Sequence, residues 1–274
     1  MPIRENSPRG SASERFDAFG FDVASYDATM RFLNLYFKYW HRVSAEGLEK
    51  IPEGPMIAYG NHAGFNLLDA LMLMVAARQH APSRRPLRLL HHIGIEKMPL
   101  IGYFMQQRLG GVIGHPANAE YILGKGEAIL TYPEGGYSTS RPFTSRRSLS
   151  PVDHFGAGFL RLAARSGAWL LPVATVGCEE AIPTLALSRR LGRHFKFDQS
   201  LYPVVPQSAL TLLPSLLGVP LHHFHFLMGF PSHIRIRVGT PWKLAPNADI
   251  EAARQSSYHA LASMVTSLEN EPCP

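Results

Sequence analysis

The chain has 274 residues, of which 46% are hydrophobic and 18% charged, and this composition is typical of a globular protein and excludes a disordered or fibrous chain. Cys178 and Cys273 are too few for a disulfide framework or a four-thiolate zinc site, and they favour a reducing compartment. The formal net charge of +6 predicts attraction to anionic partners. Because the chain contains no recognisable nucleic-acid-binding module, we expect no nucleic-acid partner. No apolar run reaches the roughly 18 to 20 residues that cross a bilayer, so we expect no membrane span.

The N-terminal region divides into two parts. Residues 1–25 are rich in Ser, Arg, Pro and Gly without a clear period, which predicts a flexible or docked arm. Residues 26–43 show a helical pattern in which apolar side chains occupy most of the circumference around Arg31, Lys38 and Arg42. This pattern fits a helix that packs against the core. It also fits an amphipathic helix at a membrane interface, where basic side chains reach anionic headgroups.

From residue 44 onwards, short apolar runs alternate with helical stretches. This alternation predicts one α/β domain over 44–274, a mixed sheet flanked by helices. The expected strands are 55–60, 87–93, 128–132, 170–176 and 234–238, and the expected helices are 67–78, 100–108, 118–123, 157–165 and 250–268. Four prolines exclude a single helix over 202–230, which we interpret as a lid or a second interfacial surface. His222, His223 and His225 lack a carboxylate at ligand spacing, so we expect no metal site there.

The block 61–69 follows the first expected strand and contains His62 and Asp69. On one continuous helix these residues would lie about 10 Å apart along the axis, so His62 must stand on a loop that folds back. Gly64 supplies the backbone freedom for such a loop, and Asn66 is expected to cap the helix that carries Asp69. Asp69 then either orients the His62 ring as a general base or merely completes the helix cap beside a loop histidine.

Two further blocks stand at strand ends. Residues 132–137 form a turn in which Gly135 and Gly136 permit a close backbone approach, so consecutive amides there could cradle an anion. The same composition also fits an ordinary turn. Residues 171–180 are expected to form a buried strand that runs into a loop with two acidic residues. In an α/β fold, strand ends are where the binding crevice usually lies.

The order and spacing of these blocks resemble the PlsC-like superfamily of glycerolipid and lysophospholipid acyltransferases. The likeness runs from about 43 to 241 and rests on these segments: 47–52, the Asn-His block (61–69), 96–102 with Gly110 and Gly111, the Pro-Glu-Gly block (132–137), the Leu-Pro-Val block (171–180), and 238–241. Segments 158–163 and 176–180 look most like the branch related to diacylglycerol acyltransferases. The resemblance implies a glycerol-3-phosphate acyltransferase-like fold.

The resemblance also implies a reaction. A fatty acyl group would pass from acyl-CoA or acyl-carrier protein to a hydroxyl of a glycerolipid or related lipid acceptor, with His62 as general base and Asp69 as its partner. The implied substrate-binding residues are Asn61, Gly64, Lys97, Glu134, Gly135, Gly136 and Arg141. No metal or cofactor is expected besides the thioester co-substrate. A peripheral position on the cytoplasmic face of a membrane is expected, and the sequence carries no signal for an oligomeric state.

The chain departs from the family pattern at two points. Six residues separate His62 from Asp69, two more than in the usual signature. Gly136 and Tyr137 stand where the family commonly has Thr-Arg, so either a later arginine such as Arg141 binds phosphate or the acceptor carries none. The longer spacer leaves open a catalytically impaired relative that binds lipid or membrane. A serine hydrolase is excluded because the chain has no Gly-x-Ser-x-Gly motif.

Overall fold

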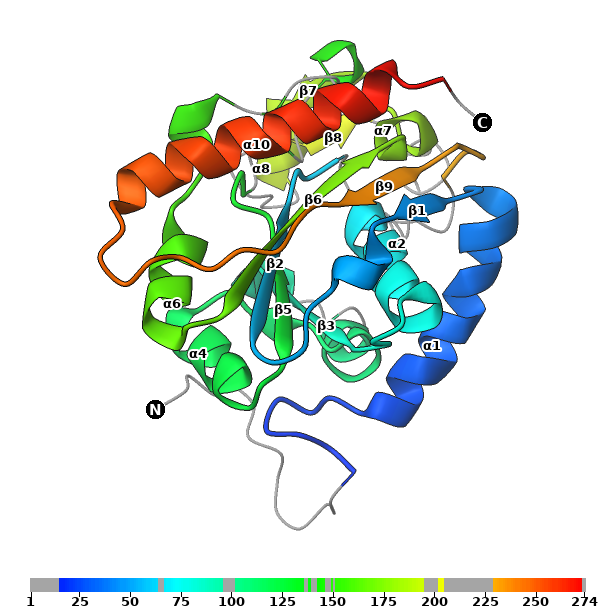
Figure 1. Ribbon diagram of the computed structural model, residues 1–274. Coiled ribbons are helices and arrows are strands. Elements are labelled where there is room, and N and C mark those ends of the chain that lie inside the picture. The colour runs from blue at the N-terminus through cyan, green and yellow to red at the C-terminus, as the bar shows by residue number, and fades with distance from the viewer. Residues whose placement is uncertain are drawn as a thin grey trace.

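The computed structural model describes residues 15–63, 67–95, 102–135, 138, 142–145, 149, 151–194, 202–204 and 229–272. Its main element is a seven-stranded sheet with the strand order β1-β9-β6-β2-β5-β3-β4 (Figure 1). These strands are β1 (Ser44–Glu46), β2 (Met56–Gly60), β3 (Leu87–His91), β4 (Val112–Ile113), β5 (Ala128–Thr131), β6 (Trp169–Val176) and β9 (Arg235–Val238). Neighbouring strands are parallel except β6 and β9, which are antiparallel. The mixed α/β fold expected from the sequence is thus confirmed.

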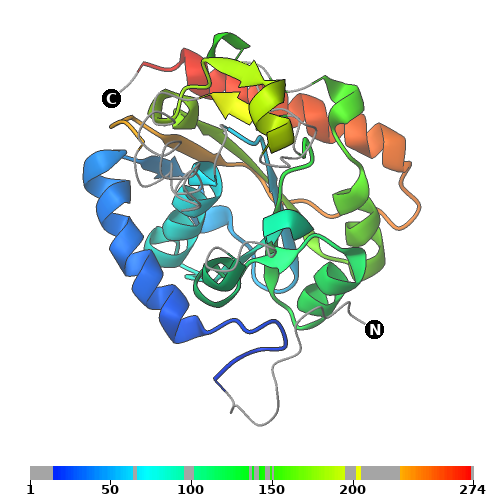
Figure 2. The ribbon, with the colours of Figure 1, turned by 180° about the vertical axis from the view of Figure 1, so that it is seen from behind.

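Helices cover both faces of the sheet (Figures 1 and 2). On one side lie α1 (Val23–Leu35), which continues as the π-helical turn Tyr36–Trp40, α2 (Leu68–Val75), which continues as the π-helical turn Ala76–His80, and the π-helical segment Phe104–Arg108. On the other side lie α4 (Pro116–Gly124), α6 (Gly158–Ser166) and α10 (Ile250–Asn270). Because side chains alternate across a strand, β2 serves both layers: Met56 and Ala58 join the α1–α2 core, whereas Ile57 and Tyr59 join the α4–α6–α10 core.

Smaller elements complete the described chain. The short helices are α7 (Cys178–Ala181) and α8 (Arg189–His194), and single 3₁₀ turns span Leu48–Lys50, Ile93–Ile95, Phe143–Ser145 and Val152–His154. A second sheet pairs β7 (Ala186–Ser188) with β8 (Tyr202–Val204) in the antiparallel sense. The sequence pattern did not predict β1, β4, β7 or β8, which have only two or three residues each. Most of the segment 202–230, with its three histidines, lies outside the described residues.

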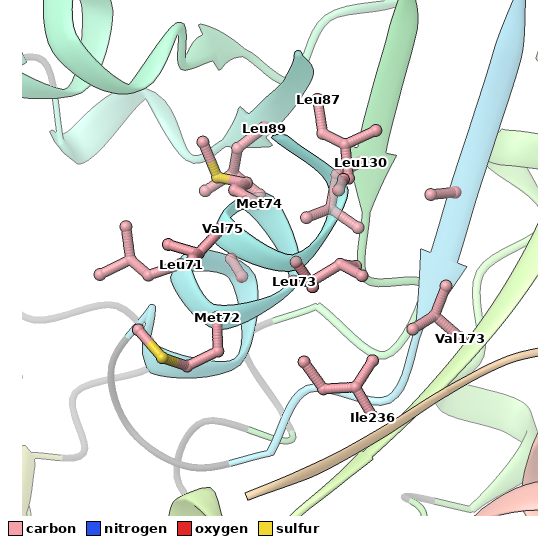
Figure 3. Close-up of a cluster of buried hydrophobic side chains, with 14 of the residues drawn as sticks. Leu71, Met72, Leu73, Met74, Val75, Leu87, Leu89, Leu130, Val173 and Ile236 are labelled. Carbon is pink, nitrogen blue, oxygen red and sulfur yellow. The ribbon is translucent and has the colours of Figure 1, made fainter. Parts of the chain in front are cut away.

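Helix α2 is buried around its whole circumference. All eight of its residues are buried, and its apolar side chains pack against Leu87, Leu89, Leu130, Val173 and Ile236 from four strands (Figure 3). A helix that is apolar on every side belongs inside a protein, and this one is enclosed between the sheet and α1. The one charged residue in α2, Asp69, is therefore held on a rigid element in the core.

Helix α1 is buried on one face and exposed on the other. It begins at Val23, three residues earlier than expected, because Asp22 caps it by accepting the backbone N–H of Ala24. Its inner face buries Tyr26, Met30 and Leu33. The outer face of α1 and of the π-helical turn after it leaves a second set of large apolar side chains exposed: Phe32 and Leu35 in α1, and Tyr39 and Trp40 in the turn. Of the helices that the structure describes, each is too short or too polar to cross a bilayer.

Candidate functional site

The site lies at the carboxyl ends of three neighbouring parallel strands. Strands β5, β2 and β6 lie side by side in register, so their carboxyl ends meet at one edge of the sheet. The segment that follows β2 carries Asn61 and His62, the one that follows β5 carries Glu134, and the last residues of β6 include Thr175. The three sequence blocks are therefore brought together, as their positions at strand ends predicted.

The side chains of His62 and Asp69 form a buried pair. The His62 ring nitrogen Nδ1 lies 2.7 Å from Asp69 Oδ2, and the two residues are 8% and 0% exposed. The backbone N–H of Ala63 donates to the same oxygen at 2.9 Å. The Asp69 carboxylate accepts both N–H groups, which places the His62 proton on Nδ1 and makes Nε2 the basic nitrogen.

This geometry explains how the long spacer is accommodated. Asp69 holds the loop backbone at Ala63 as well as the His62 ring, so the extra residues do not separate the pair. Helix α2 begins at Leu68, with Leu67 in the N-cap position and no side-chain cap. Asn66, which was expected to cap this helix, lies outside the described residues. The carboxylate of Asp69, which lies in the first turn, is engaged by the histidine loop instead.

The Pro-Glu-Gly block contacts the histidine loop through its acid. Glu134 is 2% exposed, and its Oε1 accepts the backbone N–H of His62 at 3.2 Å. Gly135 has a φ of 59°, and its N–H closes the turn onto the carbonyl of Tyr132 at 3.0 Å. Carboxylates from two different elements, Asp69 and Glu134, therefore hold consecutive backbone amides of the loop.

Asn61 ties the start of the loop to strand β6. Its Nδ2 donates to the carbonyl of Thr175 at 2.7 Å, and the backbone N–H of Thr175 donates to its Oδ1 at 2.8 Å. The Asn61 side-chain amide thus pairs with the Thr175 backbone as a neighbouring strand would, through both its NH₂ group and its oxygen. The structure gives Asn61 a role in positioning His62, which follows it directly.

Two residues that the sequence analysis did not single out also reach the site. The ring of Tyr132 stacks on the ring of His62, with centroids 4.4 Å apart and an interplanar angle of 19°. Cys178 in α7 is 1% exposed, and burial, aided by the nearby carboxylate of Asp69, raises the pKa of its thiol well above the ordinary value. A thiol held neutral in this way is a poor nucleophile. For Tyr132, the sequence signal was its place directly before Pro133 and Glu134.

Of the residues implied in substrate binding, Gly64, Lys97, Gly136 and Arg141 lie outside the described residues. Asn61, Glu134 and Gly135 are described, and each makes a contact that shapes the loops around His62. The amides of His62, Ala63 and Gly135 donate to Glu134, Asp69 and the carbonyl of Tyr132, respectively. These three amides are therefore engaged within the protein.

The chain matches known proteins at the levels of family, fold and sequence. A family model described as Acyltransferase matches residues 42–176. The solved structure of the 1-acyl-sn-glycerophosphate (LPA) acyltransferase PlsC from Thermotoga maritima superimposes with a TM-score of 0.60 at 17% identity, covering 91% of this chain and 81% of that one. Residues 42–176 thus carry an acyltransferase-family domain, and the chain has the fold of this PlsC enzyme.

Its curated relatives include mycobacterial proteins that are themselves uncharacterised. One from Mycobacterium tuberculosis strain H37Rv is 34% identical over 239 residues, which is 86% of this chain and 62% of the relative. One from Mycobacterium leprae is 33% identical over 206 residues, which is 73% of this chain and 55% of the relative. The chain thus spans less than two thirds of the length of these relatives.

Proposed function

We propose that the chain is an O-acyltransferase that moves a fatty acyl group from an acyl thioester to a hydroxyl of a glycerolipid or related lipid alcohol. The observation that carries the proposal is the buried contact of 2.7 Å between His62 Nδ1 and Asp69 Oδ2, at the edge of the sheet where the family blocks converge. A histidine held in one tautomer by a carboxylate is suited to general base catalysis near neutral pH.

The reaction needs one proton acceptor and no acyl-enzyme. The acceptor hydroxyl gives its proton to His62 Nε2 as its oxygen attacks the thioester carbon. The resulting tetrahedral oxyanion collapses and breaks the carbon–sulfur bond, and the departing thiolate takes the proton from the imidazolium. Asp69 stabilises the transient imidazolium. General acid–base catalysis of this kind raises a reaction rate by about 10² to 10⁴.

Donors for the oxyanion need to be preorganised amides. Three amides close to the base are already engaged, those of His62, Ala63 and Gly135. The sequence also offers Gly64 and Gly136, which lie outside the described residues. We propose that the oxyanion is bound by amides of the segments around these two glycines, and that Glu134 holds the histidine loop.

A neutral acceptor follows from the Pro-Glu-Gly block. The chain has Gly136 and Tyr137 in place of the Thr-Arg of the family pattern, and the Glu134 carboxylate contacts the backbone of His62. We propose a monoacylglycerol, a diacylglycerol or another lipid alcohol as the acceptor. If a later arginine such as Arg141 takes over the phosphate contact, lysophosphatidic acid will be preferred instead.

We propose that the exposed face of α1 and of the π-helical turn Tyr36–Trp40 rests on an anionic membrane surface. Phe32, Leu35 and Tyr39 are 56%, 54% and 76% exposed, and Arg31 and Lys38 stand beside them in the sequence. Aromatic side chains with basic neighbours suit the headgroup region.

Replacing Phe32 and Tyr39 together with Ser should reduce sedimentation with phosphatidylglycerol vesicles. The matched control is Leu185→Ser, which also removes an exposed apolar side chain but away from α1. Equal sedimentation of both variants would refute the assignment of this face.

An acceptor panel tests the function. The purified protein is given palmitoyl-CoA, and then palmitoyl-acyl-carrier protein, with lysophosphatidic acid, monoacylglycerol or diacylglycerol, and the acylated lipid is identified by mass spectrometry. We expect acylated product with the neutral acceptors. The absence of product with either donor, from protein shown to be folded, would instead support the alternative of a lipid-binding relative that no longer catalyses.

A further inference from the structure

The stacking of Tyr132 on His62 is built into the sheet. Strands β2 and β5 are parallel neighbours, and their register places Tyr59 opposite Thr131. Tyr132 follows Thr131 directly, and His62 follows the end of β2, so both rings leave the same sheet edge next to each other. Gly60 at the end of β2 lies so close to β6 that a Cβ there would be 2.8 Å from the carbonyl oxygen of Val173, whereas its distance of 3.5 Å to the Tyr132 ring carbon Cε1 is an ordinary contact.

The two contacts on the His62 ring are complementary. The bond from Nδ1 to Asp69 acts within the plane of the imidazole and fixes that nitrogen. The imidazole turns about its Cβ–Cγ bond, and such a turn carries Nδ1 away from the carboxylate. The face of Tyr132, nearly parallel at 19°, opposes that rotation.

The Tyr132 ring contacts His62, and its hydroxyl plays no part in that contact. Its oxygen is buried and has no hydrogen-bond partner among the residues that the structure describes. Burial, together with the nearby Asp69 carboxylate, raises the pKa of Tyr132 well above its ordinary value, so the phenol stays neutral in the range where histidine titrates. In the described part of the chain, the ionisable groups near these two rings include Asp69 from α2, Glu134 from the turn after β5, and Cys178 from α7.

We propose that Tyr132 is a positioning residue, whose aromatic face holds the His62 ring in the orientation set by Asp69 and stabilises the imidazolium that forms during acyl transfer. An aromatic face attracts a cation placed over it, so the charged ring gains more from the contact than the neutral ring. The catalytic consequence rests on the proposed function, whereas the contact between the rings does not.

Titration of the His62 ring by NMR tests the contact without any substrate. Its ring signal is assigned as the one that disappears in His62→Gln. Tyr132→Phe keeps the aromatic face and should leave the titration midpoint unchanged. Tyr132→Leu removes the face, so the imidazolium loses stabilisation and the midpoint should move to lower pH by roughly half to one pH unit. Phe159→Leu, which removes a buried ring from the opposite face of the sheet, is the matched control and should move nothing. An unchanged midpoint in Tyr132→Leu overturns the proposal.

Kinetics then measure the consequence for catalysis. In Tyr132→Leu, kcat should fall about tenfold with little change in KM, and the acid limb of the pH profile of kcat/KM should shift in the same direction as the titration. A loss of folded protein alone would lower kcat but leave the acid limb where it is. If the wild-type protein transfers no acyl group at all, the proposed function fails, while the NMR titration still decides whether Tyr132 supports the ring.

Discussion

Replacing Asp69 with Asn tests how the pair works. Asp69 Oδ2 accepts N–H groups from the His62 ring and from the backbone of Ala63, at 2.7 Å and 2.9 Å. Both of these N–H groups reach Oδ2, while Oδ1 accepts the backbone N–H of Ala70 at 2.7 Å. Asparagine has only one acceptor oxygen, so its NH₂ group faces either the Ala70 N–H or the two N–H groups at the Oδ2 position. If the NH₂ group faces the ring, Nδ1 becomes an acceptor and the proton moves to Nε2, the nitrogen that must take the proton of the acceptor hydroxyl.

The expected loss of activity is large and the expected loss of stability is small. In the serine proteases, where the Asp-to-Asn change produces the wrong tautomer, kcat falls by about 10⁴. For Asp69→Asn we expect a fall of roughly 10³, which corresponds to about 4 kcal/mol of barrier. One unsatisfied buried donor costs about 1–3 kcal/mol of folding free energy, which leaves a typical domain folded.

The assay compares initial rates of thiol release with urea unfolding for the same samples. Asp249→Asn is the matched control, because Asp249 is an exposed N-cap of α10 and asparagine caps equally well. It should retain the wild-type rate. If folded Asp69→Asn keeps more than a tenth of the wild-type activity, Asp69 does not set the tautomer of His62 and the reasoning is refuted.

Three further predictions concern stability. Arg88 is 1% exposed, and two carboxylates and the carbonyl of Gly110 accept its N–H groups, so Arg88→Met should lower the unfolding free energy by about 2–4 kcal/mol in urea. Burial lowers the pKa of His41 to about 4, so as the pH falls below about 6.5 this histidine is protonated in the unfolded state but not in the folded state. The unfolding free energy should therefore drop by about 2 kcal/mol from pH 7 to pH 5. His41→Asn should remove that part of the drop. Asn61→Ala should cost about 2–4 kcal/mol, because it leaves both backbone groups of Thr175 unpaired, and calorimetry at pH 7 measures the loss.

Each of these has a result that contradicts it. A loss below about 1 kcal/mol for Arg88→Met would show that water replaces its buried contacts. An equal pH dependence in His41→Asn and the wild-type protein would place the acid sensitivity elsewhere. Wild-type stability in Asn61→Ala would mean that the paired amide adds nothing to the link between the histidine loop and β6.

The sequence was most informative where a local pattern decides the structure. Alternating apolar runs predicted β2, β3, β5, β6 and β9 to within about two residues at each end, and helical periodicity located α4, α6 and α10. The apolar run of α2 likewise predicted a helix with Asp69 near its start. Local periodicity is decisive in these elements because each buries apolar side chains in one of the two cores that flank the sheet.

The contacts within the site depend on tertiary structure and were less predictable. The pair Asn61 and Thr175 are 114 residues apart, and only the neighbouring positions of β2 and β6 bring them together. The role of Glu134 in substrate binding stays a prediction, and the parallel pairing of β2 and β5 is what places its carboxylate on the backbone of His62. The ring of Tyr132 reaches His62 through the same pairing. The order of the strands could not be predicted from local sequence patterns, and this order determines all three contacts.

The most direct test of the central claim is thiol release from palmitoyl-CoA by the wild-type protein and by His62→Ala, with a neutral lipid acceptor and without it. The account predicts release that depends on the acceptor in the wild-type protein and a fall of at least a hundredfold in the folded variant, since the general base is missing. Acceptor-dependent release at the wild-type rate in His62→Ala would contradict the assignment of His62 as the base.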